Sequence, residues 1–173
     1  MINDNRPRPL VLTGGPAIGK STRGRLLAER QARVSFIDVD DVRQLVVAGA
    51  DAPWRSPHGT AQAALAAENS CGLAQRFQAH GFDVVIVDVL TPATSIIYRQ
   101  HLPSCLIVHL RASLDEARRR ASTRRVWLTD EEFDMLHRRD QESPPDVDVR
   151  VEVVDLGVEQ QVAAVTAFWL GSR

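Results

Sequence analysis

Lysine is almost absent from this chain of 173 residues: of its 21 basic side chains, 20 are arginines and one is Lys20. Cysteine is also scarce, because only Cys71 and Cys105 occur, far apart and without a histidine at metal-ligand spacing. We interpret both as small core residues in a reducing compartment. No apolar run approaches the roughly 20 residues of a membrane-spanning helix, and residues 1–9 lack the apolar segment of a signal peptide. We therefore expect a cytoplasmic protein.

Charge of either sign is not in excess, since the formal net charge is −1. This balance argues against nucleic acid or an anionic membrane as the principal partner. The hydrophobic share of 44% and the charged share of 25% are ordinary for a globular protein and exclude disordered and collagen-like classes. The length corresponds to about one domain, and no linker or repeat divides it, so we expect a single domain over residues 1–173.

Short apolar runs alternate with longer amphipathic stretches along the chain. The short runs predict strands over residues 10–13, 35–38, 83–88, 104–110 and 150–154. The longer stretches predict helices over residues 20–31, 40–48, 60–80, 92–100, 113–125, 129–141 and 158–170. Strands that alternate with helices form βαβ units, so we predict an α/β fold of three αβα layers around a five-stranded parallel sheet.

The first predicted strand is followed by a glycine-rich segment, GGPAIGKS, which matches G-x-x-x-x-G-K-[ST] at every fixed position. The match is informative because a strand precedes it and a helix follows. Glycines let backbone N–H groups turn toward a phosphate, and the start of the helix adds its positive end. The alternative is a glycine-rich turn that binds nothing, which the presence of the only lysine disfavours. The residues of this predicted phosphate-binding loop are Gly14, Gly15, Pro16, Ala17, Ile18, Gly19, Lys20, Ser21 and Thr22.

Within this loop, two side chains have distinct predicted tasks. Lys20 would reach the β- and γ-phosphates of bound ATP and act in catalysis, and Ser21 would offer its hydroxyl to Mg²⁺.

An acidic cluster, DVDDVR, follows the second predicted strand. Ligands of open parallel sheets bind beyond the carboxyl ends of the strands, so we expect Asp38 and Asp40 beside the phosphate-binding loop. Carboxylates there can orient Mg²⁺ or accept the proton of an attacking hydroxyl, and Arg43 can hold the acceptor. The alternative is a helix cap with acids that favour the helix dipole. The pattern leaves open which of Asp38, Asp40 and Asp41 is the base.

Together, GGPAIGKST and DVDDVR resemble the small P-loop kinases of the nucleoside-monophosphate-kinase type. Adenylylsulfate, gluconate and shikimate kinases carry Asp-x-Asp after the second strand, polynucleotide 5′-kinases carry Asp-Asp-x-Arg, and chloramphenicol phosphotransferases are similar in layout. The resemblance implies a P-loop NTPase fold, ATP and Mg²⁺ as cofactors, Asp40 as the catalytic carboxylate and Arg43 as a substrate ligand. It includes no one family's complete substrate signature, so the acceptor is not carried over.

An arginine-rich segment ends the predicted helix over residues 113–125. Small P-loop kinases have a mobile lid at this place, so the resemblance implies a short lid over about residues 118–130. Arg120 and Arg124, four residues apart, would then face the phosphates together and act in catalysis. The alternative is a solvated basic helix face.

Three further predictions come from single residues or short segments. Asp88 ends an apolar strand, as does the carboxylate that reaches Mg²⁺ through water in many P-loop enzymes, so we predict a metal role for Asp38 and Asp88 beside Ser21. Trp54 lies in the loop where related kinases build their acceptor pocket and is a candidate substrate contact. Residues 155–157 follow the last strand, where this fold commonly places backbone around adenine.

The combined prediction is an ATP-dependent kinase that transfers the γ-phosphate to a hydroxyl of a small molecule such as a sugar, metabolite or antibiotic. A polynucleotide 5′-hydroxyl kinase is the first alternative, supported by DDVR and opposed by the balanced net charge. A nucleotide-binding regulator that hydrolyses slowly or not at all is the second.

Overall fold

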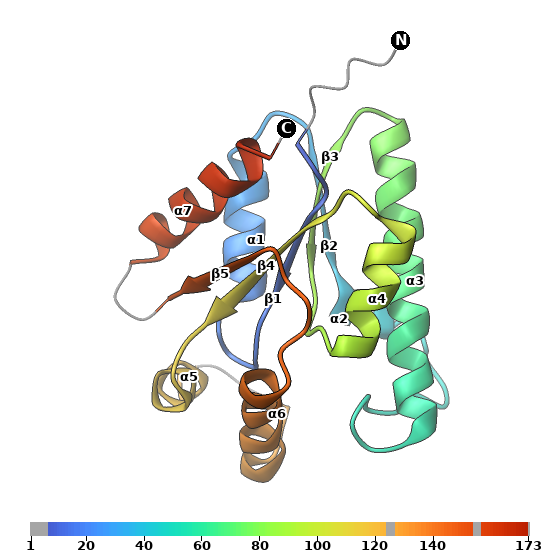
Figure 1. The fold of residues 1–173 in the computed structure, drawn as a ribbon. Coiled ribbons are helices and arrows are strands. Elements are labelled where there is room, and N and C mark those ends of the chain that lie inside the picture. The colour runs from blue at the N-terminus through green and yellow to red at the C-terminus, as the bar shows by residue number, and fades with distance from the viewer. Residues whose placement is uncertain (1–6, 124–126, 154–156, 173) are drawn as a thin grey trace.

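A computed structural model of the chain describes residues 7–123, 127–153 and 157–172. Five parallel strands form one sheet in the order β2-β3-β1-β4-β5 (Figure 1). The strands are β1 (Leu10–Thr13), β2 (Val34–Asp38), β3 (Asp83–Val87), β4 (Leu106–Arg111) and β5 (Val149–Glu152). The predicted α/β class with a five-stranded parallel sheet is confirmed.

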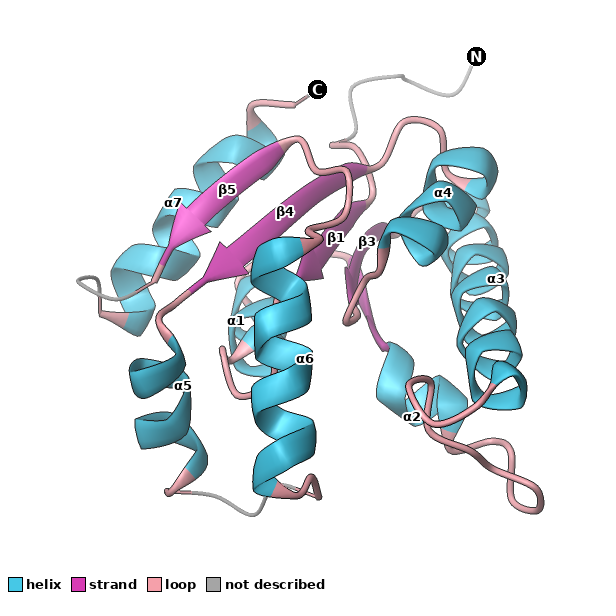
Figure 2. Ribbon diagram, turned by 60° about the horizontal axis from the view of Figure 1, so that its bottom comes forward, coloured by secondary structure: helices cyan, strands magenta, loops and turns pink. Residues whose placement is uncertain are grey.

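Helices cover both faces of this sheet. They are α1 (Lys20–Glu29), α2 (Val39–Arg43), α3 (Pro57–Ala79), α4 (Pro92–His101), α5 (Leu114–Ala121), α6 (Asp130–Glu142) and α7 (Val158–Leu170). Helices α1 and α7 pack together on one face, and α3 and α4 pack together on the other (Figure 1). Helices α5 and α6 lie beyond the carboxyl ends of β4 and β5 (Figure 2). The predicted three αβα layers are therefore present.

The core is divided by the sheet into two apolar clusters. Strand β1 is fully buried, and its side chains alternate between the clusters because successive side chains of a strand point to opposite faces. Leu10 and Leu12 join Trp169 of α7, whereas Val11 joins Tyr98 of α4. Burial on both faces is the reason that the central strands are continuous apolar runs.

Three helix boundaries differ from the prediction by three residues or more. The second helix was predicted over residues 40–48 but ends at Arg43, and Leu45 and Val47 beyond it are exposed rather than packed on a helical face. Helix α3 begins three residues before the predicted start, because the Ser56 side chain caps it and a proline occupies its first turn. Helix α5 ends at Ala121, four residues before the predicted end.

Candidate active site

The phosphate-binding loop joins β1 to α1, and its glycines are required by close packing. Gly14 and Gly19 have positive φ angles of 145° and 90°. A Cβ atom on Gly14 would lie 2.3 Å from the carbonyl oxygen of Leu110 on β4, so no other residue fits there without displacing the backbone. Ala17 also has a positive φ of 57°, in the left-handed region that non-glycine residues seldom adopt. The loop therefore has a specific, strained shape.

The loop holds the side chain of Lys20 over its own backbone. The ammonium Nζ donates to the carbonyl oxygens of Gly14 at 2.8 Å and Gly15 at 2.9 Å. Burial lowers the pKa of Lys20, and the nearest carboxylates, led by Asp40 and Asp140, oppose that shift. The positive charge is thus held at the centre of the loop, where phosphate oxygens would meet it.

The acidic cluster lies where β2 ends and α2 begins. Asp38 caps α2, because its Oδ1 accepts the backbone N–H of Asp40 at 3.1 Å. The Asp40 side chain is 71% exposed and accepts from Nη1 of Arg43 at 2.9 Å. The capping function that the sequence suggested as an alternative is therefore performed by Asp38, while the carboxylate of Asp40 stays accessible.

Asp88 lies behind this cluster and is buried. Its Oδ1 accepts from Nη2 of Arg43 at 2.8 Å and from the backbone N–H of Val89 at 2.8 Å, and its Oδ2 accepts from the Tyr98 hydroxyl at 3.1 Å. Burial raises the pKa of Asp88, and the Arg43 guanidinium opposes that shift. Arg43 therefore bridges an accessible carboxylate and a buried one, which fixes the position of both.

One cavity of about 630 Å³ brings most of the predicted site residues together. The phosphate-binding loop forms one wall and the acidic cluster a second, and other lining residues come from α3 and the loop before it, α4 and α6. The predicted site residues that line it are Pro16, Ala17, Gly19, Lys20, Ser21, Asp38, Asp40, Arg43, Trp54 and Asp88. Gly14, Gly15, Ile18 and Thr22 belong to the loop but are not among the described residues that line the cavity.

The oxygen donors in this cavity fit a magnesium ion. Ser21 is exposed, and Asp38 has its second carboxylate oxygen outside the capping bond. Mg²⁺ in nucleotide sites takes one or two protein oxygens and completes its shell with phosphates and water. Both oxygens of Asp88 accept hydrogen bonds, so its metal role would require a bridging water, and it stays a prediction.

Of the two predicted lid arginines, one lies among the described residues. Arg124 lies outside the described residues. Arg120 pairs with Glu116 of its own helix at 2.6 Å and donates to the carbonyl oxygens of Ile18 and Val153 at 3.0 Å each. It supports the phosphate-binding loop from α5 and is not among the described residues that line the cavity. Its action on phosphates stays a prediction.

A buried polar cluster under the loop was missed by the sequence analysis. Asp140 of α6 accepts the backbone N–H of Gly15 at 3.1 Å and lies 3.0 Å from Nε2 of His109 on β4. A Cβ atom on Gly15 would lie 2.8 Å from Nδ1 of His137, so α6 packs directly on the loop. No local motif could reveal this cluster, because its members come from three distant elements.

A second support of the loop comes from Arg23, one turn into α1. Its Nη1 donates to the carbonyl oxygens of Ile18 at 2.8 Å and Gly19 at 3.0 Å, and its Nε donates to the Gln161 side chain of α7. Burial lowers the pKa of Arg23 to about 10. The carbonyl of Ile18 thus accepts from two arginines, Arg23 and Arg120, on α1 and α5.

Helix α6 also reaches across the cavity to the loop before α3. Trp54 donates through Nε1 to Glu132 at 3.0 Å, and Arg55 donates to the same oxygen at 2.8 Å. These bonds, that of Trp54 first, hold the pKa of Glu132 at about 2. Arg139, one further residue that the sequence analysis missed, is exposed and lines the cavity from the last turn of α6.

Comparison with known proteins gives a match in structure alone. No family model matches the sequence, and no curated protein matches it. A sugar kinase from Janibacter sp. superposes with a TM-score of 0.72 at 16% identity, covering 95% of each chain. A gluconokinase from Sinorhizobium meliloti superposes with a TM-score of 0.62 at 18% identity, covering 95% of this chain and 92% of that one. Shikimate kinase from Acinetobacter baumannii superposes with a TM-score of 0.63 at 16% identity, covering 96% and 95%.

These neighbours share the fold of the small P-loop kinases. The fold that the resemblance implied is therefore confirmed. Identities of 16–18% bear on the fold and not on the acceptor. In the described part of the chain, no helix is long and apolar enough to span a bilayer.

Proposed function

We propose that the protein is an ATP- and Mg²⁺-dependent phosphotransferase that transfers the γ-phosphate to a hydroxyl of a small molecule. One observation carries the proposal: the only lysine, in a strained phosphate-binding loop, faces the same cavity as an accessible carboxylate fixed by an arginine. A nucleotide-binding regulator would need the loop but would not need Asp40 and Arg43 opposite it.

On the phosphate side, the loop backbone and the amino end of α1 would bind the β- and γ-phosphates. Lys20 would exchange its two carbonyl partners for phosphate oxygens, which keeps its buried charge paired. Ser21 and Asp38, with Asp88 through water, would hold Mg²⁺, which when bound neutralises charge on the phosphate oxygens.

On the acceptor side, Asp40 would accept the proton of the attacking hydroxyl while the new oxygen–phosphorus bond forms and the bond to ADP breaks. Arg43 holds the carboxylate of Asp40 in position and would bind the substrate. Trp54, held by Glu132, would form part of the acceptor wall. Arg120, Arg124 and Arg139 would close on the phosphates and exclude water, which otherwise would take the phosphoryl group.

The cysteines and the net charge support a location for the protein and a class of acceptor. Both cysteines are free and buried, which supports a reducing, cytoplasmic location. A net charge of −1 supports a small-molecule acceptor over a nucleic acid.

The test is incubation with Mg²⁺ and γ-labelled ATP against sugars, polyhydroxy acids, amphipathic alcohols and 5′-hydroxyl oligonucleotides. We expect label on a small alcohol and none on the oligonucleotides. Label on oligonucleotides alone would replace the proposal by a polynucleotide kinase, and release of free phosphate with no labelled acceptor would favour the regulator.

A further inference from the structure

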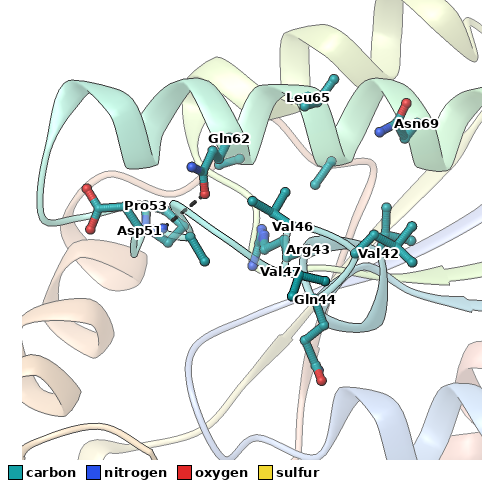
Figure 3. Close-up of a pocket in the computed structure, with 14 residues that line it drawn as sticks. Val42, Arg43, Gln44, Val46, Val47, Asp51, Pro53, Gln62, Leu65 and Asn69 are labelled. Atoms are coloured by element: carbon teal, nitrogen blue, oxygen red, sulfur yellow. Dashed lines mark hydrogen bonds between the residues drawn. The ribbon is translucent and has the colours of Figure 1, made fainter.

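A second groove opens beside the reaction cavity. It has a volume of about 490 Å³ and lies between α3 and the segment that follows α2 (Figure 3). Val46 lies beneath α3 in this groove, whereas Gln44 points away from the helix (Figure 3). The groove and the reaction cavity share four wall residues, namely Arg43, Gln44, Pro53 and Ala63. A molecule with its hydroxyl at Asp40 could therefore extend past Arg43 into the groove.

The wall of the groove is largely apolar, and its apolar side chains reach solvent. Leu45 is 75% exposed, Val47 is 93% exposed and Leu65 of α3 is 48% exposed. Clustered apolar residues left in water next to a concave site commonly mark a ligand surface. Helical packing does not account for this exposure, because α2 ends at Arg43.

The charged side chains that line the groove already have partners. Arg43 donates to Asp40 and Asp88. Asp51 accepts from Ser56 and from the backbone N–H of Ala52. Among the described lining residues, these are the charged ones, so an ionised acid in the groove would find no uncompensated charge to replace the water it loses.

The acceptor wall of the reaction cavity has the same character. Its apolar side chains come from the loop before α3, from α4, from the residues just before α6 and from α6 itself. They are Trp54, Ile97, Trp127, Leu128 and Leu136. The two hollows thus place largely apolar walls on either side of Arg43 and Gln44, between Asp40 and the far end of the groove.

We infer that the acceptor is an amphipathic alcohol whose bulky alkyl or aromatic portion occupies the groove between α3 and residues 42–47. This inference rests on the proposed function, because it takes the hydroxyl of that molecule to lie at Asp40. It distinguishes this acceptor from compact polyhydroxylated acids and sugars, which have no apolar portion to fill the groove.

The experiment uses n-alkanols from butanol to decanol as probes, titrated into the intact protein and followed by amide NMR. Each added methylene buried in an apolar site improves affinity about three- to fourfold. We expect that gain along the series, with shifts at residues 42–47 and 62–69. Equal affinity for all alkanols, no binding, or shifts confined to another surface would overturn the inference.

Two matched variants locate the effect. Leu65→Gln removes an apolar wall of the groove, and Leu73→Gln changes a leucine of the same helix that lines neither hollow and is 39% exposed. We expect Leu65→Gln to weaken decanol binding roughly three- to tenfold and butanol binding little, while Leu73→Gln leaves both unchanged. Equal effects of the two variants would show nonspecific adsorption and overturn the inference.

Failure of the amphipathic acceptor and failure of the proposed kinase function give different results. Transfer of labelled phosphate to a compact polyhydroxylated alcohol, with no response to alkanol length, would leave the kinase standing and remove the amphipathic acceptor. Alkanol binding at the groove with no phosphate transfer to any alcohol would remove the kinase.

Discussion

The wall formed by the phosphate-binding loop and the region on the proposed acceptor side differ in the residues that form them. The phosphate-binding loop is held by buried polar groups, among them Asp140, His109 and Arg23, each at most 8% exposed. The groove beside the proposed acceptor side is lined by exposed apolar residues such as Leu45 and Val47. A buried polar network is costly to disturb and rigid, whereas exposed apolar contacts tolerate change. The difference suggests that the side that would meet an invariant triphosphate is rigid and the side that would meet a particular acceptor is adaptable.

The largest expected effect is on the phosphate side, at Lys20. Lys20→Ala should reduce turnover by about 10³–10⁵-fold, because one preorganised charge at the transferring phosphate is lost. Stability should be unchanged or raised, since burial penalises this ammonium. Steady-state kinetics with a thermal unfolding curve as the folding control would measure both. Turnover close to that of the wild type would contradict the role.

Next is Asp40 on the acceptor side. Asp40→Asn should lower phosphate transfer by about 10²–10⁴-fold through loss of the base, while the affinity for Mg-ATP stays nearly constant. Asp41→Asn is the matched control, because Asp41 is the adjacent exposed acid of the same helix. Binding and transfer are measured separately by titration and single-turnover kinetics. An equal loss in both would move Asp40 to a structural or metal-binding role.

The buried network predicts a stability effect of intermediate size. Asp140→Ala removes the partner of both Gly15 and His109 and should lower the free energy of unfolding by about 2–4 kcal/mol. Asp134→Ala on the same helix breaks a more exposed pair with Arg118 and should cost less than about 1 kcal/mol. Urea unfolding compares them. Similar losses for the two variants would show that the polar network does not stabilise the fold.

The smallest expected effect concerns pH and His137. Burial is the main reason that the pKa of His137 lies below 6.5. The unfolded chain therefore binds a proton here before the folded chain does, so stability falls as the pH drops below about 6.5. His137→Leu should flatten the dependence of the unfolding free energy between pH 7 and pH 5. An unchanged slope in urea titrations at several pH values would assign the dependence to other groups.

Much of the fold follows from local patterns, and part of the site does too. Apolar runs such as residues 83–88 and the loop from Gly14 to Thr22 are continuous in sequence, so their structure could be predicted from their neighbours alone. Asp38 and Asp40 follow a strand end, which places them at the edge where ligands of parallel sheets bind.

The supports of the loop could not be predicted in this way. The bond between Gly15 and Asp140 joins residues 125 positions apart, and nothing near Asp140 in sequence distinguishes it from a surface acid. The end of α2 at Arg43 was missed for a related reason. Leu45 and Val47 belong to an apolar run that favoured a longer helix, but both lie exposed beside α3, which comes later in the chain.

The most direct test of the central claim is a calorimetric titration of the wild-type protein and of Lys20→Ala with Mg-ATP. We expect the wild type to bind with a dissociation constant between about 1 μM and 1 mM, the usual range of KM values for enzyme substrates, and Lys20→Ala to bind far more weakly. Absence of binding by the folded wild type, or equal binding by both proteins, would contradict the claim that this loop binds a triphosphate.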